Sequence, residues 1–376
     1  MDLSLTLRFR SPELSLFHGK PISPFSFPRK QYQPIFPCPK TNPKPHFSVT
    51  AKQRSPIEGI SKDLNAIASQ NLDFASCRRR VRSAFVEVQQ ELDHCLFKMA
   101  PTGIRTEEWY ERNSKGLQIF CKSWMPESGV PIKGIAKRIA ASGYGIYALD
   151  HPGFGLSDGL HGYIPSFDQL VDNVIENYTK IKGRPELRGL PHFLLGQSMG
   201  GAVALKVHLK EPLGWDGVIL VAPMCKIAEE VKPPSPVLKV LTLMSNVLPK
   251  AKLFPQKDLA ELAFRDFRKR KMAVYNVICY KDQTRLKTAV ELLKVTSEIE
   301  KQVEKVSSPL LILHGAADKV TDPLVSQFLY EKASTKDKTL KLYDDGYHCI
   351  LEGEPDDRIF TVLNDIVSWL DSRVSS

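Results

Sequence analysis

The sequence predicts an α/β fold in which a mainly parallel β-sheet is covered by helices on both faces. From residue 145 to residue 221, short apolar runs alternate with amphipathic stretches, and the alternation returns from residue 310 onward. Apolar strands that alternate with helices of about 10–15 residues are typical of a parallel sheet buried on both sides. The composition, 42% hydrophobic and 25% charged over 376 residues, is that of a globular protein. No run reaches the roughly 18 apolar residues that a membrane span needs.

The elements are predicted in chain order as follows. Residues 73–98 place apolar side chains at helical spacing and form a leading helix ahead of a domain over 100–376. Two alternating runs, 107–111 and 117–124, are separated by Asn-Ser-Lys-Gly and predict a hairpin. The later strands are expected at 145–149, 192–195, 218–221, 310–313 and 339–343, and the later helices at 167–181, 201–209, 324–333 and 359–374.

The first 60 residues are predicted to be a disordered, transit-peptide-like segment. Nine of the 27 prolines lie in residues 1–54, together with nine Lys or Arg and two Asp or Glu. Such a segment cannot bury enough apolar surface to offset the entropy of ordering it. A basic, acid-poor leader indicates an organelle transit peptide, and the prolines favour the chloroplast. The alternative is a plain disordered tail on a cytoplasmic protein.

Several classes of partner are not indicated. The net charge of +10 is mostly carried by residues 1–54, so the body gives no reason to expect nucleic-acid binding. The seven cysteines form no C-x-x-C pair, which favours reduced thiols over a disulfide framework. The histidines lack metal-ligand spacing, and the G-x-G-x-x-A at 143–148 leads into a strand instead of leaving one. We therefore expect no metal and no cofactor.

Gly196-Gln197-Ser198-Met199-Gly200 has the G-x-S-x-G pattern between an apolar strand and a helix. A strand-to-helix turn of this kind projects the serine outward, and its glycines let strand and helix pack closely. Ser198 would then lie at a helix N-terminus, which favours a developing negative charge. The alternative is an ordinary serine in a tight turn.

Asp318 and His348 each follow a predicted strand. Catalytic groups in open α/β sheets gather beyond the carboxyl ends of strands. Aspartate there can accept a hydrogen bond from a histidine, and histidine can activate a serine hydroxyl. The chain order Ser198, Asp318, His348 is the order that an α/β-hydrolase requires. Taken singly, Asp318 could be a turn former and His348 a structural histidine.

Six stretches add to these motifs: HCLFK at 94–98, ALDHPGFGLSDGLHGYIPSFD at 148–168, FLLGQSMGGAVALKVHLKEP at 193–212, VAPMCKIAEEVKPP at 221–234, LILHGAADKVTDP at 311–323 and YHCILEGEPD at 347–356. With them, residues 75–376 resemble the plant monoacylglycerol lipase-like and caffeoylshikimate esterase-like serine hydrolases of the α/β-hydrolase superfamily. The resemblance implies an ester hydrolase with nucleophile Ser198, base His348, orienting Asp318, and an oxyanion donor at the Met199 N–H. It also implies a helical cap insertion at about 226–300.

The chain departs from the family in one place. Members of the family have a central third strand and an H-G-Y-G-type loop after the hairpin, whereas 18 residues, Pro126–Gly143, here separate the hairpin from the next strand. A strand, a loop and a full helix need about 35–40 residues. We therefore expect the third strand to be absent, and with it the second oxyanion donor.

Two functions follow from the sequence. The first is a serine esterase acting on monoacylglycerol, lysophospholipid or a similar small ester. The second is a catalytically impaired splice or gene-model variant that binds ligand or folds poorly. In the cap, the stretch from Ser235 is apolar nearly all round, which indicates packing against the core or peripheral contact with a greasy ligand or membrane. The basic run at 265–271 is either a solvated helix face or a site of attraction to anionic lipid headgroups.

Overall fold

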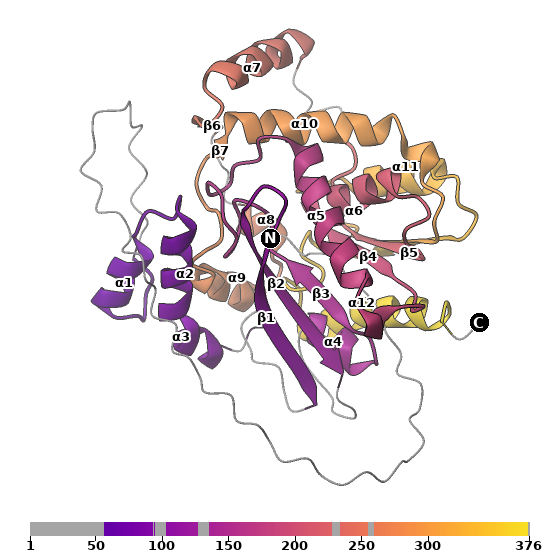
Figure 1. Cartoon of the computed structure of the whole chain (residues 1–376), viewed down its shortest axis with the longest axis horizontal. Helices are drawn as coiled ribbons and strands as arrows, with labels where there is room; N and C mark the ends of the chain where they lie inside the picture. Colours follow the sequence, from indigo (N-terminus) through magenta and orange to yellow (C-terminus); the bar gives the residue numbers. More distant parts are fainter. Residues whose placement is uncertain are drawn as a thin grey trace.

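The computed structural model describes residues 56–92, 94, 103–126, 135–227, 234–254 and 259–374. Its main strands form two sheets (Figure 1). The three-stranded sheet has the order β1 (Ile104–Arg112), β2 (Gln118–Pro126), β3 (Ile146–Leu149), with antiparallel pairing. The four-stranded sheet is parallel and has the order β4 (Phe193–Gln197), β5 (Gly217–Val221), β8 (Leu310–Gly315), β9 (Lys338–Tyr343). The alternation seen in the sequence thus produces the parallel sheet that it predicts.

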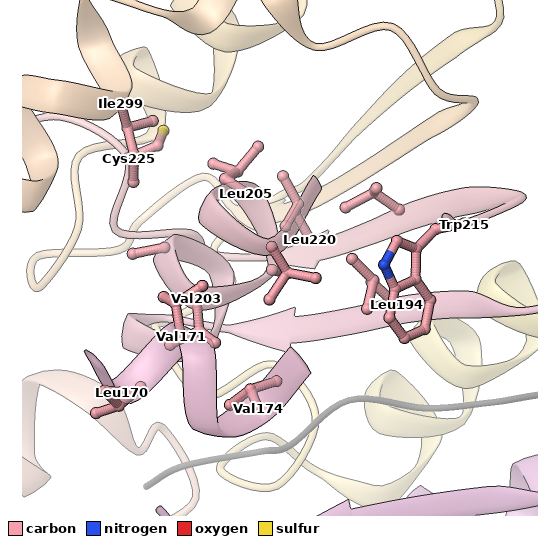
Figure 2. Close-up of a cluster of buried hydrophobic side chains, with 14 of the residues drawn as sticks. Leu170, Val171, Val174, Leu194, Val203, Leu205, Trp215, Leu220, Cys225 and Ile299 are labelled. Carbon is pink, nitrogen blue, oxygen red and sulfur yellow. The ribbon is translucent and has the colours of Figure 1, made fainter. Parts of the chain in front are cut away.

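Helices cover both faces of the four-stranded sheet because three of its strands, β4, β5 and β8, are buried on both sides. On one face, Leu194 and Leu220 pack with α5 (Phe167–Lys182) and α6 (Met199–Lys210), as Figure 2 shows. On the other face, Phe193 and Leu195 pack with α4 (Ile135–Ala141) and α12 (Asp356–Asp371). The other helices of the body are α10 (Leu286–Glu300), on the first face, and α11 (Pro323–Lys332). These two layers hold the strand ends that carry the candidate site.

The hairpin predicted at 107–124 is confirmed. Arg112 pairs with Gln118, and the side chain of Asn113 accepts hydrogen bonds from the N–H groups of Lys115 and Leu117 inside the turn. Gly116 has a φ of +78°, a left-handed value that glycine adopts without strain. An asparagine and a glycine at these two positions therefore fix the turn.

The leading segment differs from its prediction. Where the sequence predicts one helix over 73–98, the structure has α2 (Ala75–Ala84) and α3 (Val86–Glu91), preceded by α1 (Lys62–Ala68). The helix breaks at Phe85, whose ring is buried in a small cluster with Val81 and Leu72. The last residues of the predicted helix lie outside the described residues.

The cysteine prediction is wrong at one position. Cys77, buried on α2, is disulfide-bonded. The four other cysteines that the structure describes are free: Cys121, Cys225, Cys279 and Cys349.

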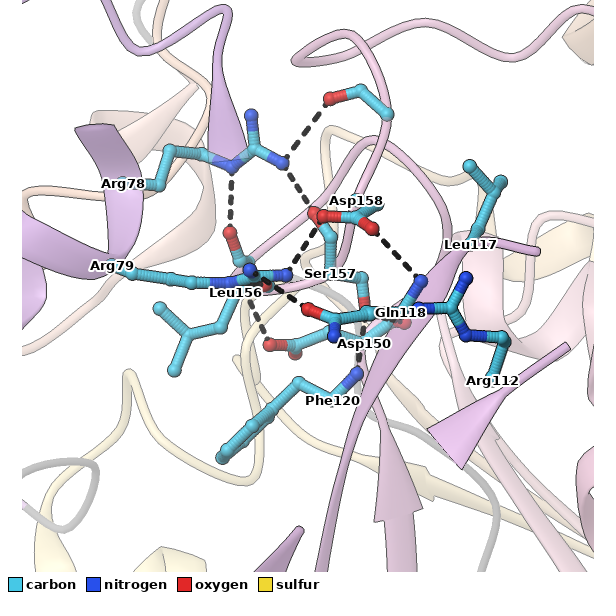
Figure 3. A network of polar contacts seen from close by, with 12 residues as sticks. Arg78, Arg79, Arg112, Leu117, Gln118, Phe120, Asp150, Leu156, Ser157 and Asp158 are labelled. Atoms are coloured by element: carbon cyan, nitrogen blue, oxygen red, sulfur yellow. Dashed lines mark hydrogen bonds and ion pairs between the residues drawn. The ribbon is translucent and has the colours of Figure 1, made fainter. Parts of the chain in front are cut away.

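The loop after β3 is held by α2 (Figure 3). The buried Arg78 guanidinium donates to the carbonyl oxygens of Gly155 (2.7 Å), Ser157 (2.5 Å) and Leu72 (2.9 Å). Burial lowers the pKa of Arg78 to about 10, with the neighbouring charge of Arg79 acting in the same direction. The Asp150 carboxylate accepts the N–H of Leu156 at 2.8 Å. This loop is thus fixed from both sides by polar contacts.

No ladder joins β3 to β4 in the part of the chain that the structure describes. The Asp150 N–H donates to Phe120 O, so antiparallel alternation turns the carbonyl of Tyr147 toward the edge opposite β2. There the buried Tyr178 hydroxyl of α5 donates to it at 3.0 Å. Side chains also bridge the two sheets, since Ile146 and Phe193 belong to one apolar cluster. We call this boundary between β3 and β4 the seam.

The expected loss of the third strand and its loop falls on residues 127–134, which lie outside the described residues.

The cap segment runs from the top of Figure 1, where α7 (Ser235–Val247) lies, down to α9 (Phe267–Met272), which lies beside α2. It also contains β6 (Lys252–Phe254), α8 (Ala260–Ala263) and β7 (Thr284–Arg285), and runs into α10. In Figure 1, α7 lies outermost and rests on α10. No helix among the described residues has the length and apolar character to cross a membrane.

Candidate active site

Ser198 lies at the turn between β4 and α6. Its backbone has a φ of +52° and a ψ of −118°, a conformation that costs free energy in a residue with a side chain. A Cβ on Gly201 would come within 2.7 Å of Pro223, and one on Gly196 would collide with the Gly200 carbonyl. Gly196, a glycine of the motif, and Gly201, just beyond it, therefore permit the close packing around the turn that holds Ser198 in this conformation.

Met199 is the first residue of α6. The N–H groups of the first helical turn have no intrahelical partner, so the Met199 N–H is available to an anion beside Ser198. The segment that would supply the second oxyanion donor, residues 127–134, lies outside the described residues.

Asp318 and His348 meet beyond the ends of β8 and β9. His348 Nδ1 lies 2.7 Å from Asp318 Oδ2, and both side chains are almost fully buried. A carboxylate only accepts hydrogen bonds, so the imidazole carries its proton on Nδ1 and keeps a lone pair on Nε2. Burial raises the pKa of the Asp318 carboxyl, but the hydrogen bonds from His314 and His348 outweigh it and hold that pKa well below its usual range. Asp318 is thus a charged acceptor, and it orients the imidazole of His348 as a base.

His314, at the end of β8, is a further partner of Asp318 that the sequence pattern does not single out. Its Nε2 lies 3.0 Å from Asp318 Oδ2, and its Nδ1 lies 2.6 Å from the Ser326 hydroxyl. Asp318 also accepts the N–H groups of Val320 (2.7 Å) and Thr321 (3.1 Å). The signal for His314 was present in the run Leu313-His314-Gly315, but its role depends on a side chain four residues further along.

Ser198 lies at the same edge of the sheet as this pair. β5 separates β4 from β8, and the loop after β5 links the two parts: Met224 N–H donates to Ser198 O at 2.9 Å, and Thr321 Oγ1 lies 3.3 Å from Ala222 O and 2.8 Å from Asp318 Oδ2. The described residues show no hydrogen bond between Ser198 Oγ and His348. Catalytic hydrogen bonds are often long before substrate binds, so the pairing of these two side chains stays a prediction.

Within the described residues, no group of three or more His, Cys, Asp or Glu side chains is arranged to hold a metal ion.

Comparison with known proteins adds to this geometry. The family model for serine aminopeptidase, S33 (Hydrolase_4) matches residues 125–356. Caffeoylshikimate esterase of Arabidopsis thaliana is 32% identical over 291 residues, covering 72% of this chain and 87% of that protein. Human monoglyceride lipase is 29% identical over 285 residues, covering 70% of this chain and 90% of that protein.

Two solved structures are similar in fold. The monoacylglycerol lipase of Paleococcus ferrophilus has a TM-score of 0.55 at 26% identity, covering 62% of this chain and 86% of that one. A soluble variant of monoglyceride lipase from Saccharomyces cerevisiae has a TM-score of 0.60 at 22% identity, covering 73% and 99%.

Proposed function

The chain belongs to the Hydrolase_4 (serine aminopeptidase, S33) family, and from this premise we propose that it is a serine hydrolase that cleaves a carboxylic ester of the monoacylglycerol type. The observation that carries the proposal is the buried Asp318–His348 pair at the sheet edge where Ser198 is held in a strained turn. The names of the relatives, caffeoylshikimate esterase and monoglyceride lipase, support an ester as the substrate.

In the proposed mechanism, Ser198 Oγ attacks the ester carbonyl carbon while its proton passes to His348 Nε2. The carbonyl electron pair moves onto oxygen, and the Met199 N–H stabilises the oxyanion. Collapse of the intermediate breaks the C–O bond, and the alcohol takes the proton from His348. The acyl group now forms an ester with Ser198 Oγ. Water, which gives a proton to His348, attacks this ester; the bond between carbon and Ser198 Oγ breaks, the acid leaves, and Ser198 takes the proton back. Asp318 holds the imidazole in the required tautomer and stabilises its charged form.

A second candidate is a chain of the same family with impaired catalysis. The short distance in sequence between β2 and β3 supports it, together with the seam, where no described strand pairs β3 with β4. A missing oxyanion donor typically costs about 10²–10³ in rate. Buried backbone groups left without partners cost about 1–3 kcal/mol each.

A fluorophosphonate probe separates the two candidates. An active esterase is expected to label at Ser198 with full stoichiometry, to lose labelling in Ser198→Ala, and to release fatty acid from monoacylglycerol. Hydrolysis of lysophospholipid and of a phenolic ester, measured in parallel, then identifies the substrate. If the folded wild-type chain labels at least 10²-fold more slowly than an active serine hydrolase, the second candidate, impaired catalysis, is supported. If Ser198 does not label at all, the esterase proposal is refuted.

We also propose that α7 contacts a membrane surface or the acyl chain of the substrate. Leu238, Leu241 and Ser245 face inward at helical spacing, whereas Leu243 is 68% exposed and Val247 is 73% exposed. An exposed apolar patch of this kind marks an interaction site. Sedimentation with phosphatidylcholine vesicles tests the membrane contact: Leu243→Glu with Val247→Glu is expected to reduce vesicle binding at least tenfold, and unchanged binding would refute that contact.

We further propose that residues 1–60 direct the chain to the chloroplast. The basic, proline-rich and acid-poor composition of residues 1–54 supports the proposal. Fusion of residues 1–60 to a fluorescent reporter is expected to place the reporter in plastids. A reporter that stays in the cytosol would support the cytoplasmic alternative.

A further inference from the structure

The basic run at 265–271 is partly used inside the protein. Lys269 is 6% exposed, and its ammonium donates to Glu354 O at 2.7 Å and to the Asp356 carboxylate at 2.6 Å. Arg265 donates to the Asp345 carbonyl at 2.7 Å. Two members of the run therefore contact the stretch around His348.

We propose that Glu354 and Arg265 are positioning residues that fix the loop carrying the catalytic imidazole and couple it to the cap. We call residues 344–348 the histidine loop. The inference rests on the proposed function, because it assigns partners to the backbone of the proposed general base.

Glu354 holds the histidine loop from within. Its side chain is buried, and its Oε1 accepts the N–H of Tyr347, the residue before His348, at 2.7 Å. A hydrogen bond to an ionised carboxylate is about twice as strong as one between neutral groups. This bond fixes the peptide unit just before the imidazole.

Two arginines connect the same carboxylate to the start of the loop. Arg358 of α12 lies 3.2 Å from Glu354 Oε2 and donates to the carbonyl of Asp344. Arg265 of the cap lies 4.0 Å from Glu354 Oε2 and donates to the carbonyl of Asp345. Asp345 has a φ of +54°, a left-handed conformation that persists only when its surroundings hold it. The arginines supply part of that support.

The backbone of the cap is bonded to the stretch that follows His348. The Cys349 N–H donates to Ala263 O at 3.0 Å, and the Asp266 N–H donates to Gly353 O at 2.8 Å. Because these bonds and Arg265 come from one short segment between α8 and α9, a displacement of this part of the cap moves the histidine loop with it.

Arg268 provides a matched control in the same run. Its side chain is 85% exposed and, in the part of the chain that the structure describes, pairs with Asp266 alone. Replacing it removes the same charge from the cap without touching the histidine loop.

Hydrogen exchange of the peptide containing Tyr347, followed by mass spectrometry, tests the positioning directly. We expect the exchange of this peptide to become at least tenfold faster in Glu354→Ala and in Arg265→Ala, and to stay at the wild-type rate in Arg268→Ala. Glu354→Gln retains an oxygen that can accept the Tyr347 N–H, so we expect it to restore most of the protection. Wild-type exchange in both alanine variants would overturn the proposal.

The pH profile of fluorophosphonate labelling distinguishes positioning from a purely structural role. A loosened histidine loop weakens the Asp318 contact that stabilises the imidazolium. The midpoint of labelling is therefore expected to move to lower pH in Arg265→Ala and Glu354→Ala, with labelling at pH 7 at least fivefold slower than in Arg268→Ala. Midpoints equal to that of wild type would refute the inference.

If the wild-type chain does not label, the proposed function fails, and the exchange measurement still decides the positioning. If Glu354→Ala does not fold, Arg265→Ala decides it.

Discussion

The loops after β8 and β9 and the loop after β3 all follow a strand and are rich in polar side chains, yet they use those groups differently. After β8 and β9, Asp318 and His348 bind each other, and the imidazole keeps a nitrogen free for a substrate. After β3, the carboxylate of Asp150 and the carbonyl of Ser157 are taken up by the Leu156 N–H and by Arg78. In the first region, one imidazole nitrogen remains available for catalysis. In the second region, the polar groups only fix the loop after β3 and connect it to α2.

The largest effect is expected at Asp318. Asp318→Asn presents an amide that can hold the wrong imidazole tautomer, so the rate of probe labelling should fall by about 10⁴. Asp150→Asn, the matched change after β3, should leave the labelling of folded protein within about threefold of wild type. The rate of probe labelling is measured for both variants, and unfolding curves check that each is folded. An equal loss of labelling rate in the two variants would contradict the different roles of Asp318 and Asp150.

A large loss of stability is expected when the hydrogen bonds between Arg78 and the loop after β3 are removed. Arg78→Met leaves buried carbonyls of the leading segment and the 155–159 stretch without their donor, so the free energy of unfolding should fall by about 3 kcal/mol. Arg80→Met, on the exposed side of the same helix, should change it by less than about 0.5 kcal/mol. Urea titrations measure the free energy of unfolding of the two variants. Equal values would show that the Arg78 hydrogen bonds do not stabilise the fold.

A smaller effect on stability is expected at Glu352, which lies after β9 of the four-stranded sheet, close to Cys349. Burial raises the pKa of the Glu352 carboxyl to about 7 from an ordinary value near 4.5. The folded chain therefore holds a proton that the unfolded chain has released, and stability falls as the pH rises from about 4.5 to 7.

Glu352→Gln should remove that decline and exceed wild-type stability at pH 8 by about 2 kcal/mol. Urea titrations at pH 5 and pH 8 measure the difference. A wild-type stability that is flat over this interval would mean that Glu352 titrates normally.

The smallest effect is expected at the seam. Tyr178→Phe removes the hydroxyl that donates to the Tyr147 carbonyl and should cost about 1 kcal/mol of unfolding free energy. Tyr110→Phe, on the half-exposed outer strand, should cost less than half as much. If both variants unfold at the same urea concentration, the seam gains nothing from the Tyr178 hydroxyl.

Periodicity and strand ends were enough to predict much of this molecule. The α/β class, the hairpin and the resemblance to the family are confirmed, because apolar alternation and the G-x-S-x-G turn are local signals. Ser198, Asp318 and His348 could be predicted as candidate site residues because each follows a strand that is visible in the sequence.

Other features depend on side chains that meet only in the folded chain. His314 joins Asp318 across one turn of loop, and Glu354 reaches back to Tyr347, so neither role has a pattern of its own. The break at Phe85 was missed because the apolar spacing of the leading segment continues through it. The basic run looked solvated because its partners, Glu354 and Asp356, lie about 90 residues further along.

The seam has a consequence for the cooperativity of unfolding. The ladders of the three-stranded sheet join residues within 104–149, whereas those of the four-stranded sheet join residues spread over 193–343. Since no described ladder spans them, each set of backbone bonds can open without breaking the other, and side-chain packing and side-chain hydrogen bonds couple the two sheets. The three-stranded sheet pairs residues that are close in sequence, so it can form before the four-stranded sheet does.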